Sequence, residues 1–192
     1  MMMEKRHTVR KYLDKPLDMD LIGLLNDRIE RNNCVYNLTF KLITNNSDGL
    51  SSLARLMSNN SVQNYIILAG KDNSDLDKKI GYCGADLILY AQSLGLNTWW
   101  CGGMFNGKNA LKHLDNKAVR VNGVIAIGYG KTQGVPHKSK TADQVSHYKG
   151  DAPEWFTSGI KALLLAPSAL NRQPYIVNGE GNKVSLKVKN GT

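Results

Sequence analysis

The stretch Ala166-Pro167-Ser168-Ala169-Leu170-Asn171-Arg172-Gln173-Pro174 marks a passage from a helical to an extended pattern. Its two prolines bracket a turn, and Pro167 stops the preceding helix. The hydroxyl and amide groups between them offer fixed hydrogen-bond donors and acceptors, which suit a planar heteroaromatic ligand. Taken alone, such a stretch is more often an ordinary helix-ending turn.

The segments on either side of this turn have clear local signals. Asp151 and Glu154 form a capping box for a helix that carries Trp155, Phe156 and further apolar residues up to Leu164. After the turn, residues 175–177 and 184–188 flank a glycine- and asparagine-rich stretch, which predicts a hairpin.

The remainder of the chain mixes helical and extended periodicities. Asp18 caps a helix, and strict alternation over residues 36–42 predicts a strand with one wet face. Further elements are expected as a short helix (48–57), a strand (65–69), a helix (74–94), an extended run (98–101), a strand interrupted by Gly123 (119–127) and a long connection (128–150). Because strands and helices do not alternate regularly, we expect a single α+β domain over residues 1–192, with a mixed sheet flanked by helices.

Composition excludes several classes. The 192 residues are 42% hydrophobic and 21% charged, and the apolar runs are too short to span a bilayer. The N-terminus lacks the apolar region of a secretory signal, so a cytoplasmic protein is expected. Three cysteines and four scattered histidines give no disulfide framework and no metal-ligand spacing. Neither a dinucleotide-binding nor a P-loop glycine pattern occurs.

Positive charge points to an anionic partner. The net charge of +9 fits a nucleic acid, a membrane surface or a phosphorylated ligand, and charge alone does not choose among them. Near the N-terminus, Arg6-His7-Thr8-Val9-Arg10 places two guanidinium groups around an imidazole and a hydroxyl. Such a cluster can clamp a phosphate, although alone it is more often a frayed basic terminus.

A third segment combines aromatic residues with glycines. Trp99-Trp100-Cys101-Gly102-Gly103 ends an extended run, and adjacent glycines let backbone N–H groups approach a ligand closely. A simple tight turn explains them equally well.

Together these segments resemble the FMN-dependent nitroreductase family from about Lys5 to about Val177. The basic run continues into Tyr12 and Lys15-Pro16, as in the family's phosphate-gripping segment. Residues 95–105 match its G-L-[GN]-T-x-W-x-G-G-F pattern, and residues 166–174 match its A-P-S-x-x-N-x-Q-P segment, with Tyr175 in place of tryptophan. The motif order resembles a smaller subgroup in which the A-P-S segment comes late in the chain.

The resemblance implies a nitroreductase-like, mainly antiparallel α+β fold and a bound FMN. It assigns Pro167, Ser168, Asn171 and Gln173 to the isoalloxazine ring, the backbone of Gly102 and Gly103 to the flavin N5 region, and Lys138 and Lys140 to a second phosphate contact. The full set of cofactor-binding candidates is Arg6, His7, Thr8, Arg10, Trp100, Cys101, Gly102, Gly103, Lys138, Lys140, Pro167, Ser168, Asn171 and Gln173. A homodimer is also expected, because family members usually build the flavin site at a dimer interface.

The implied activity is NAD(P)H-dependent reduction of small planar acceptors such as nitroaromatics or quinones. FMN would accept hydride at N5 and then pass electrons to the acceptor, giving ping-pong kinetics without a catalytic side chain. Two alternatives stay open. One is a flavin-binding carrier or sensor without turnover, and the other is a nucleic-acid-binding module, for which only the charge argues.

Overall fold

The structure is a computed structural model that describes residues 2–189. Packing divides the chain into two compact units, of which the larger holds Met2 and residues 4–135 and the smaller holds Met3 and residues 136–189. The single domain over residues 1–192 stays a prediction.

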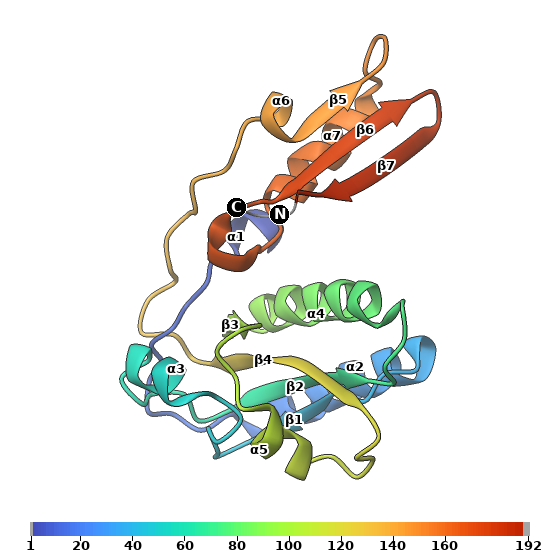
Figure 1. The fold of residues 1–192 in the computed structure, drawn as a ribbon. Coiled ribbons are helices and arrows are strands. Elements are labelled where there is room, and N and C mark those ends of the chain that lie inside the picture. Colours follow the sequence, from blue (N-terminus) through green and yellow to red (C-terminus); the bar gives the residue numbers. More distant parts are fainter. Residues whose placement is uncertain (1, 190–192) are drawn as a thin grey trace. The chain divides into compact units, whose positions relative to one another are not determined.

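A four-stranded antiparallel sheet forms the centre of the larger unit (Figure 1). Its spatial order is β1-β2-β4-β3, with bounds β1 (Lys41–Ile43), β2 (Tyr65–Gly70), β3 (Asn97–Cys101) and β4 (Arg120–Gly128). The register shifts between Leu68 and Ala69 of β2, opposite Gly123. A Cβ atom on Gly123 would lie 2.9 Å from the Cys101 carbonyl oxygen, so this strand position requires glycine.

Helices cover both faces of this sheet, because alternate strand residues point to opposite sides. On one face, α2 and α4 pack Leu25 and Leu87 against Ile66 of β2. On the other face, Ala54 of α3 and Ala110 of α5 join Ile67 in a second core. The helices that begin in the larger unit are α2 (Met19–Tyr36), α3 (Ser52–Met57), α4 (Leu76–Ser93) and α5 (Gly107–Lys112), and α1 (Met2–Lys5) precedes them.

The smaller unit packs a helix on a three-stranded sheet of order β5-β6-β7. Phe156 and Ile160 of the helix α7 bury Val177 of the central strand. Its elements are α6 (Ala142–Val145), β5 (Ser146–Tyr148), α7 (Glu154–Leu164), the 3₁₀ helix η1 (Ala169–Asn171), β6 (Tyr175–Glu180) and β7 (Lys183–Val188). The β5–β6 pairing is parallel and the β6–β7 hairpin is antiparallel. The sheets are therefore mainly antiparallel, as the family resemblance implies.

Several element predictions are confirmed, one is confirmed in part and two are wrong. The buried strands, the long helix α4 and the terminal hairpin lie where the sequence places them. The strand expected over residues 36–42 is confirmed in part. Its first residues are wrong, because α2 continues through Tyr36 and Asn37 adopts a left-handed conformation as its C-cap, whereas Leu38 forms a bridge with Gly70 and β1 begins at Lys41. The long connection predicted over residues 128–150 contains α6 and β5, and α7 begins after Pro153, so Asp151 is not its cap.

No helix among residues 2–189 is both long and apolar enough to cross a membrane.

Candidate functional site

The basic N-terminal segment is extended and lies beside β3. Thr8 forms a parallel bridge with Thr98, and the backbone N–H of Val9 donates to the Thr98 carbonyl at 3.1 Å. Val9 and Tyr12 anchor the segment because both side chains are buried. Burial raises the pKa of Tyr12 well above its ordinary value, and its hydroxyl donates to the Ala126 carbonyl at 3.2 Å. Backbone pairing and two apolar anchors therefore fix the segment that the sequence treats as a phosphate clamp.

The two arginines of this segment have different surroundings. Arg6 is only 7% exposed, and burial lowers the pKa of its guanidinium. Within residues 2–189 no hydrogen bond or ion pair engages that guanidinium. Arg10 is exposed, and its Cζ atom lies 5.5 Å from the centre of the Trp99 ring. Arg6 is thus a desolvated cation that lacks an anion, whereas Arg10 is held by an aromatic face.

The two tryptophans of β3 point to opposite faces of the sheet. Trp99 joins the core that contains α3 and α5. Trp100 packs on α4 so closely that a Cβ atom on Gly84 would lie 2.3 Å from its ring. Cys101 is 1% exposed, and burial raises the pKa of its thiol to about 12. The thiol is therefore protonated near neutral pH and is a packing group rather than a nucleophile.

The glycine turn that follows β3 has an accessible backbone. A Cβ atom on Gly103 would meet nothing within 4 Å, and one on Gly102 would come no closer than 3.8 Å to Trp100. The turn's far end is bonded to the loop before α3: the Ser51 N–H donates to the Met104 carbonyl at 3.2 Å. Open space over a fixed turn is the geometry that close approach of a ligand to backbone N–H groups needs.

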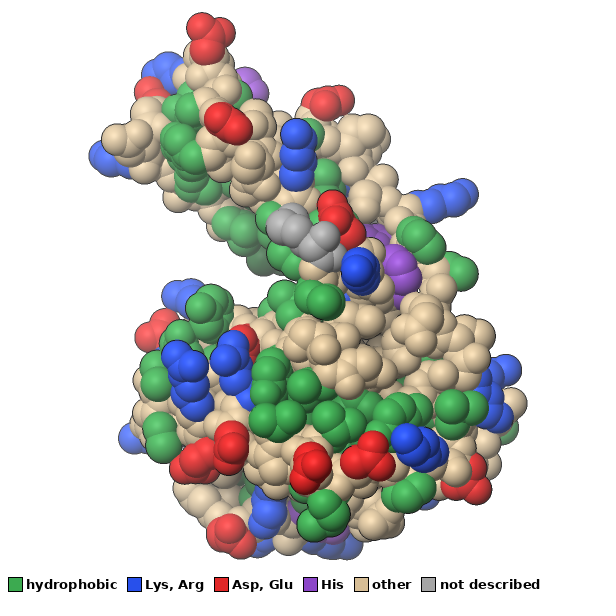
Figure 2. Space-filling view, turned by 180° about the vertical axis from the view of Figure 1, so that it is seen from behind, with side chains coloured by type: hydrophobic (Ala, Val, Ile, Leu, Met, Phe, Trp, Pro, Cys, Tyr) green, Lys and Arg blue, Asp and Glu red, His purple; other side chains and the backbone are tan. Residues whose placement is uncertain are grey.

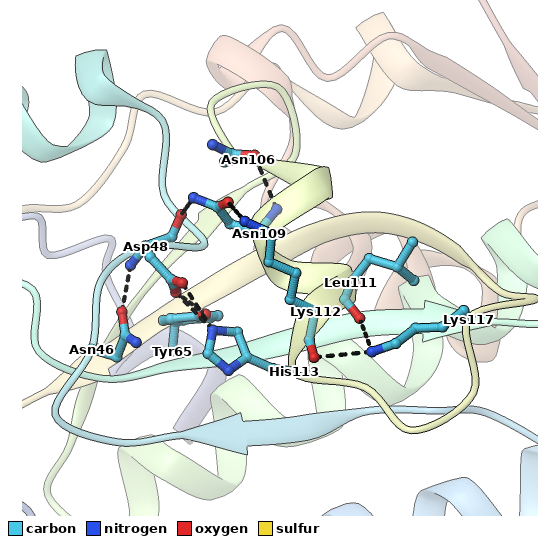
Figure 3. A network of polar contacts seen from close by, with 9 residues as sticks. All are labelled: Asn46, Asp48, Tyr65, Asn106, Asn109, Leu111, Lys112, His113 and Lys117. Carbon is cyan, nitrogen blue, oxygen red and sulfur yellow. Dashed lines mark hydrogen bonds and ion pairs between the residues drawn. The ribbon is translucent and has the colours of Figure 1, made fainter.

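A polar network that the sequence gives no means of finding lies beside this turn (Figure 3). The Asp48 carboxylate accepts hydrogen bonds from the Tyr65 hydroxyl at 2.7 Å and from His113 Nε2 at 2.9 Å. Burial alone would raise the pKa of Asp48, but these two hydrogen bonds outweigh it and lower the pKa. His113 is 65 residues away from Asp48 along the chain, so no local motif signals the pair.

In the smaller unit, the segment of Lys138 and Lys140 lies against the turn that the sequence assigns to the flavin ring. Asn171 Nδ2 donates to the Lys138 carbonyl at 2.7 Å. The Lys140 ammonium donates to the Gln173 carbonyl at 3.0 Å. Leu170, Asn171 and Gln173 all have positive φ angles, which residues other than glycine rarely adopt. The structure therefore brings together two of the four predicted segments, the lysine segment (138–140) and the turn over residues 166–174.

Gln173 is the centre of that turn. It is 1% exposed, and its Oε1 accepts from the Lys140 backbone N–H at 2.7 Å. Its Nε2 donates to the Leu164 carbonyl at 3.0 Å, and its own N–H donates to Ser168 Oγ at 3.0 Å. Pro167 and Asn171 remain exposed. Gln173 thus joins the end of α7 to the lysine segment.

The predicted site residues accordingly fall into two groups, one in each unit. The larger unit holds Arg6, His7, Thr8, Arg10, Trp100, Cys101, Gly102 and Gly103 along one sheet edge and its turn. The smaller unit holds Lys138, Lys140, Pro167, Ser168, Asn171 and Gln173.

The face drawn in Figure 2 shows no concentration of positive charge that would favour a nucleic-acid-binding module. There, Asp and Glu side chains of the larger unit lie beside hydrophobic ones, with Lys and Arg side chains between and around them. Positive charge is not gathered into one patch on that face, as a nucleic-acid backbone would need.

Solved structures of nitroreductases share this fold. The structure of a "putative nitroreductase" from Thermotoga maritima is 18% identical, with a TM-score of 0.67, over 97% of this chain and 74% of that one. One from Desulfovibrio desulfuricans, described as a complex with FMN, is 16% identical with a TM-score of 0.60, over 79% of this chain and 95% of that one. A "putative NADH dehydrogenase/NAD(P)H nitroreductase" from Parabacteroides distasonis is 19% identical with a TM-score of 0.57, over 76% and 95%. These likenesses confirm the nitroreductase-like fold.

Comparison with curated protein sequences gives no match. The sequence model of the family described as "Putative TM nitroreductase", in contrast, matches residues 1–192. The resemblance read from the motifs is thereby confirmed: the chain belongs to this nitroreductase family.

Proposed function

We propose that this protein binds FMN and uses it to reduce small planar acceptors such as nitroaromatics or quinones with NAD(P)H. Family membership and the FMN complex of a relative with the same fold support the cofactor. The observation that carries the proposal is Arg6, a residue that is only 7% exposed and whose guanidinium pairs with no anion within residues 2–189. An unpaired buried cation is costly, and the dianionic phosphate of FMN is a partner that would offset this cost.

The residues of the larger unit fit the other demands of the cofactor. Arg10 and Thr8 lie on the same extended segment as Arg6 and would extend the phosphate contact. The open backbone at Gly102 and Gly103 would face the flavin ring, and the ring of Trp100 would fix the strand that presents them. When bound, FMN supplies the hydride chemistry itself. The chain contributes binding, orientation and exclusion of water, and the protonated Cys101 thiol takes no part as a nucleophile.

The resemblance also assigns residues of the smaller unit to the flavin. The exposed ammonium of Lys138 is the candidate for the phosphate, whereas that of Lys140 already donates to the Gln173 carbonyl. Ser168 and Asn171 keep hydrogen-bonding capacity for a ligand. Ser168 Oγ accepts from the Gln173 N–H, and its hydroxyl can donate elsewhere. Asn171 donates through Nδ2 to the Lys138 carbonyl, and its side-chain oxygen can accept. Gln173 would act by holding the turn, and the exposed Pro167 is a candidate for contact with the flavin ring. We further propose a homodimer, as the resemblance implies.

The test is a titration of the purified apoprotein with FMN, followed by flavin fluorescence and absorbance. Wild-type protein should bind FMN, and the double variant Arg6→Ala/Arg10→Ala should bind it at least about 100-fold more weakly, because each charged hydrogen bond contributes about 1.5–3 kcal/mol. The control Arg31→Ala/Lys161→Ala removes the same charge from two exposed helix positions and should leave the affinity nearly unchanged. A wild-type protein that gains no flavin spectrum contradicts the proposal, as does equal affinity of the two double variants.

A further inference from the structure

The Asp48 carboxylate is a junction between three parts of the larger unit. It lies in the loop before α3, and its partners are Tyr65 of β2 and His113 at the end of α5. His113 Nε2 lies 3.0 Å and 2.9 Å from the two carboxylate oxygens (Figure 3). Because both carboxylate oxygens are acceptors, Nε2 carries the hydrogen, and its N–H is shared between the two oxygens.

The loop that carries Asp48 packs closely on Tyr65 of β2. A Cβ atom on Gly49 would lie 2.4 Å from the Tyr65 ring, so the backbone is seated directly on that ring. Tyr65 is fully buried in the core, and both burial and its hydrogen bond to Asp48 raise the pKa of its hydroxyl. The tyrosine hydroxyl therefore stays protonated near neutral pH and donates to Asp48 from a buried position.

The helix α5 depends on this junction for its placement. With six residues it is too short to be stable alone. Asn106 caps its first turn by accepting from the Asn109 N–H, and Asn109 Nδ2 donates to the Asp48 carbonyl oxygen at 3.2 Å. Lys117 donates to three carbonyls at its C-terminal end, those of Leu111, Lys112 and Leu114. The His113–Asp48 contact is the second side-chain bond, after that of Asn109, that ties this capped helix to the loop.

The same loop is bonded through its backbone to the segment that follows the glycine turn. The Asn106 N–H donates to the Gly49 carbonyl at 2.8 Å, and Leu50 forms a bridge with Phe105. On its other side the turn continues from Cys101, which pairs with Val124 of β4. The Gly102–Gly103 turn thus lies between β3 and a segment that is hydrogen-bonded to the loop carrying Asp48.

We propose that Asp48 and His113 are positioning residues that fix the backbone of Gly102 and Gly103 for its approach to the flavin. The inference rests on the proposed function, because that function places the flavin ring at this turn. Neither side chain needs to touch the cofactor. Their role is to keep α5, and with it residues 104–106, in the position that leaves open space around Gly102 and Gly103.

The first test is amide hydrogen exchange of the FMN-free protein. His113→Ala should speed exchange of residues 102–106 by at least about tenfold and leave the amides of β2 and β4 unchanged, whereas His113→Gln, whose amide can still donate to Asp48, should retain most of the protection. Equal acceleration throughout the larger unit would show a merely global loss of stability. Unchanged exchange at residues 102–106 would show that the pair does not hold the turn. Either result overturns the inference.

The second test compares two variants that each lose one tyrosine hydroxyl bound to an aspartate. Tyr65→Phe removes the donor to Asp48, and Tyr129→Phe removes the donor to Asp18, at 2.6 Å on another part of the unit. In FMN-loaded protein, Tyr65→Phe and His113→Ala should shift the visible spectrum and the reduction potential of the flavin, and Tyr129→Phe should not.

A loosened turn with an unchanged flavin spectrum and potential would overturn the positioning role. If wild-type protein takes up no FMN, the proposed function fails, and the exchange experiment still decides whether the pair fixes the turn.

Discussion

The side chain of Asn33 binds both backbone polar groups of Phe40. Asn33 Nδ2 donates to the Phe40 carbonyl at 2.9 Å, and the Phe40 N–H donates to Asn33 Oδ1 at 2.8 Å. A helix residue thereby takes the place of a neighbouring strand at the entry to β1. The contact fixes how the chain leaves α2, because it satisfies two groups that would otherwise stay unpaired in a half-buried place.

Replacing Asn33 should therefore destabilise the protein more than replacing another half-buried polar residue that lacks such hydrogen bonds. We expect Asn33→Ala to lower the free energy of unfolding by about 1–3 kcal/mol, because it leaves both Phe40 groups unsatisfied. Asn26→Ala, an exposed position on the same helix, is the matched control and should change it by no more than about 0.5 kcal/mol. Urea denaturation measures both. Equal effects of the two variants would contradict the role of the Asn33 side chain.

Two glycines of α4 should respond in opposite ways to alanine. A Cβ atom on Gly84 would lie 2.3 Å from the Trp100 ring, whereas one on Gly81 would meet nothing within 4 Å. We expect Gly84→Ala to destabilise by about 1–3 kcal/mol through overpacking and Gly81→Ala to stabilise by about 0.5–1 kcal/mol through helix propensity. Thermal unfolding of both variants is the measurement. A harmless Gly84→Ala would show that Trp100 is not packed on α4.

The buried amide of Gln173 should protect one specific backbone group. Its Oε1 accepts from the Lys140 N–H, so Gln173→Leu should speed hydrogen exchange of the Lys140 amide and destabilise the smaller unit by about 1–3 kcal/mol. Arg172→Ala, which changes the exposed neighbour, is the control. Unaltered exchange at Lys140 in the Gln173 variant would mean that the turn does not hold the lysine segment.

Acid should weaken the network around Asp48. The pKa of Asp48 is lowered in the folded protein, so the unfolded chain binds its proton more readily. The stabilisation is present above the unfolded pKa of about 3.9 and is lost as the pH falls through the folded value. The difference in unfolding free energy between wild type and Asp48→Asn should be largest near neutral pH and shrink below about pH 4. A difference that stays constant down to pH 2.5 would contradict this expectation.

The parts of the fold that the sequence predicts are those with long or fully buried patterns. Residues 65–69 form an uninterrupted apolar run, and the apolar spacing of α4 persists over five turns. The strand prediction fails only at residues 36–37, where α2 ends and Asn37 adopts a left-handed conformation. From Leu38 onward the alternation is that of an extended segment beside β2. Residues 142–148 escape prediction because a four-residue helix and a three-residue strand are too short to show a period.

The candidate site divides in the same way. Motifs locate the segments that hold Arg6, Gly102 and Gln173, because each is a short run with its own chemistry. They do not reveal that Arg6 is desolvated or that the Gln173 amide is consumed within its turn, since both depend on packing. The Asp48–His113 pair is beyond sequence reasoning, because folding alone brings the two residues together.

Anaerobic titration of the FMN-loaded protein with NADH and with NADPH tests the central claim most directly. If the protein is an FMN-dependent oxidoreductase, at least one nucleotide should bleach the visible absorbance of the flavin, and a quinone added afterwards should restore it. A flavin that dithionite bleaches and both nucleotides leave fully oxidised would contradict the account and favour a carrier or sensor without turnover.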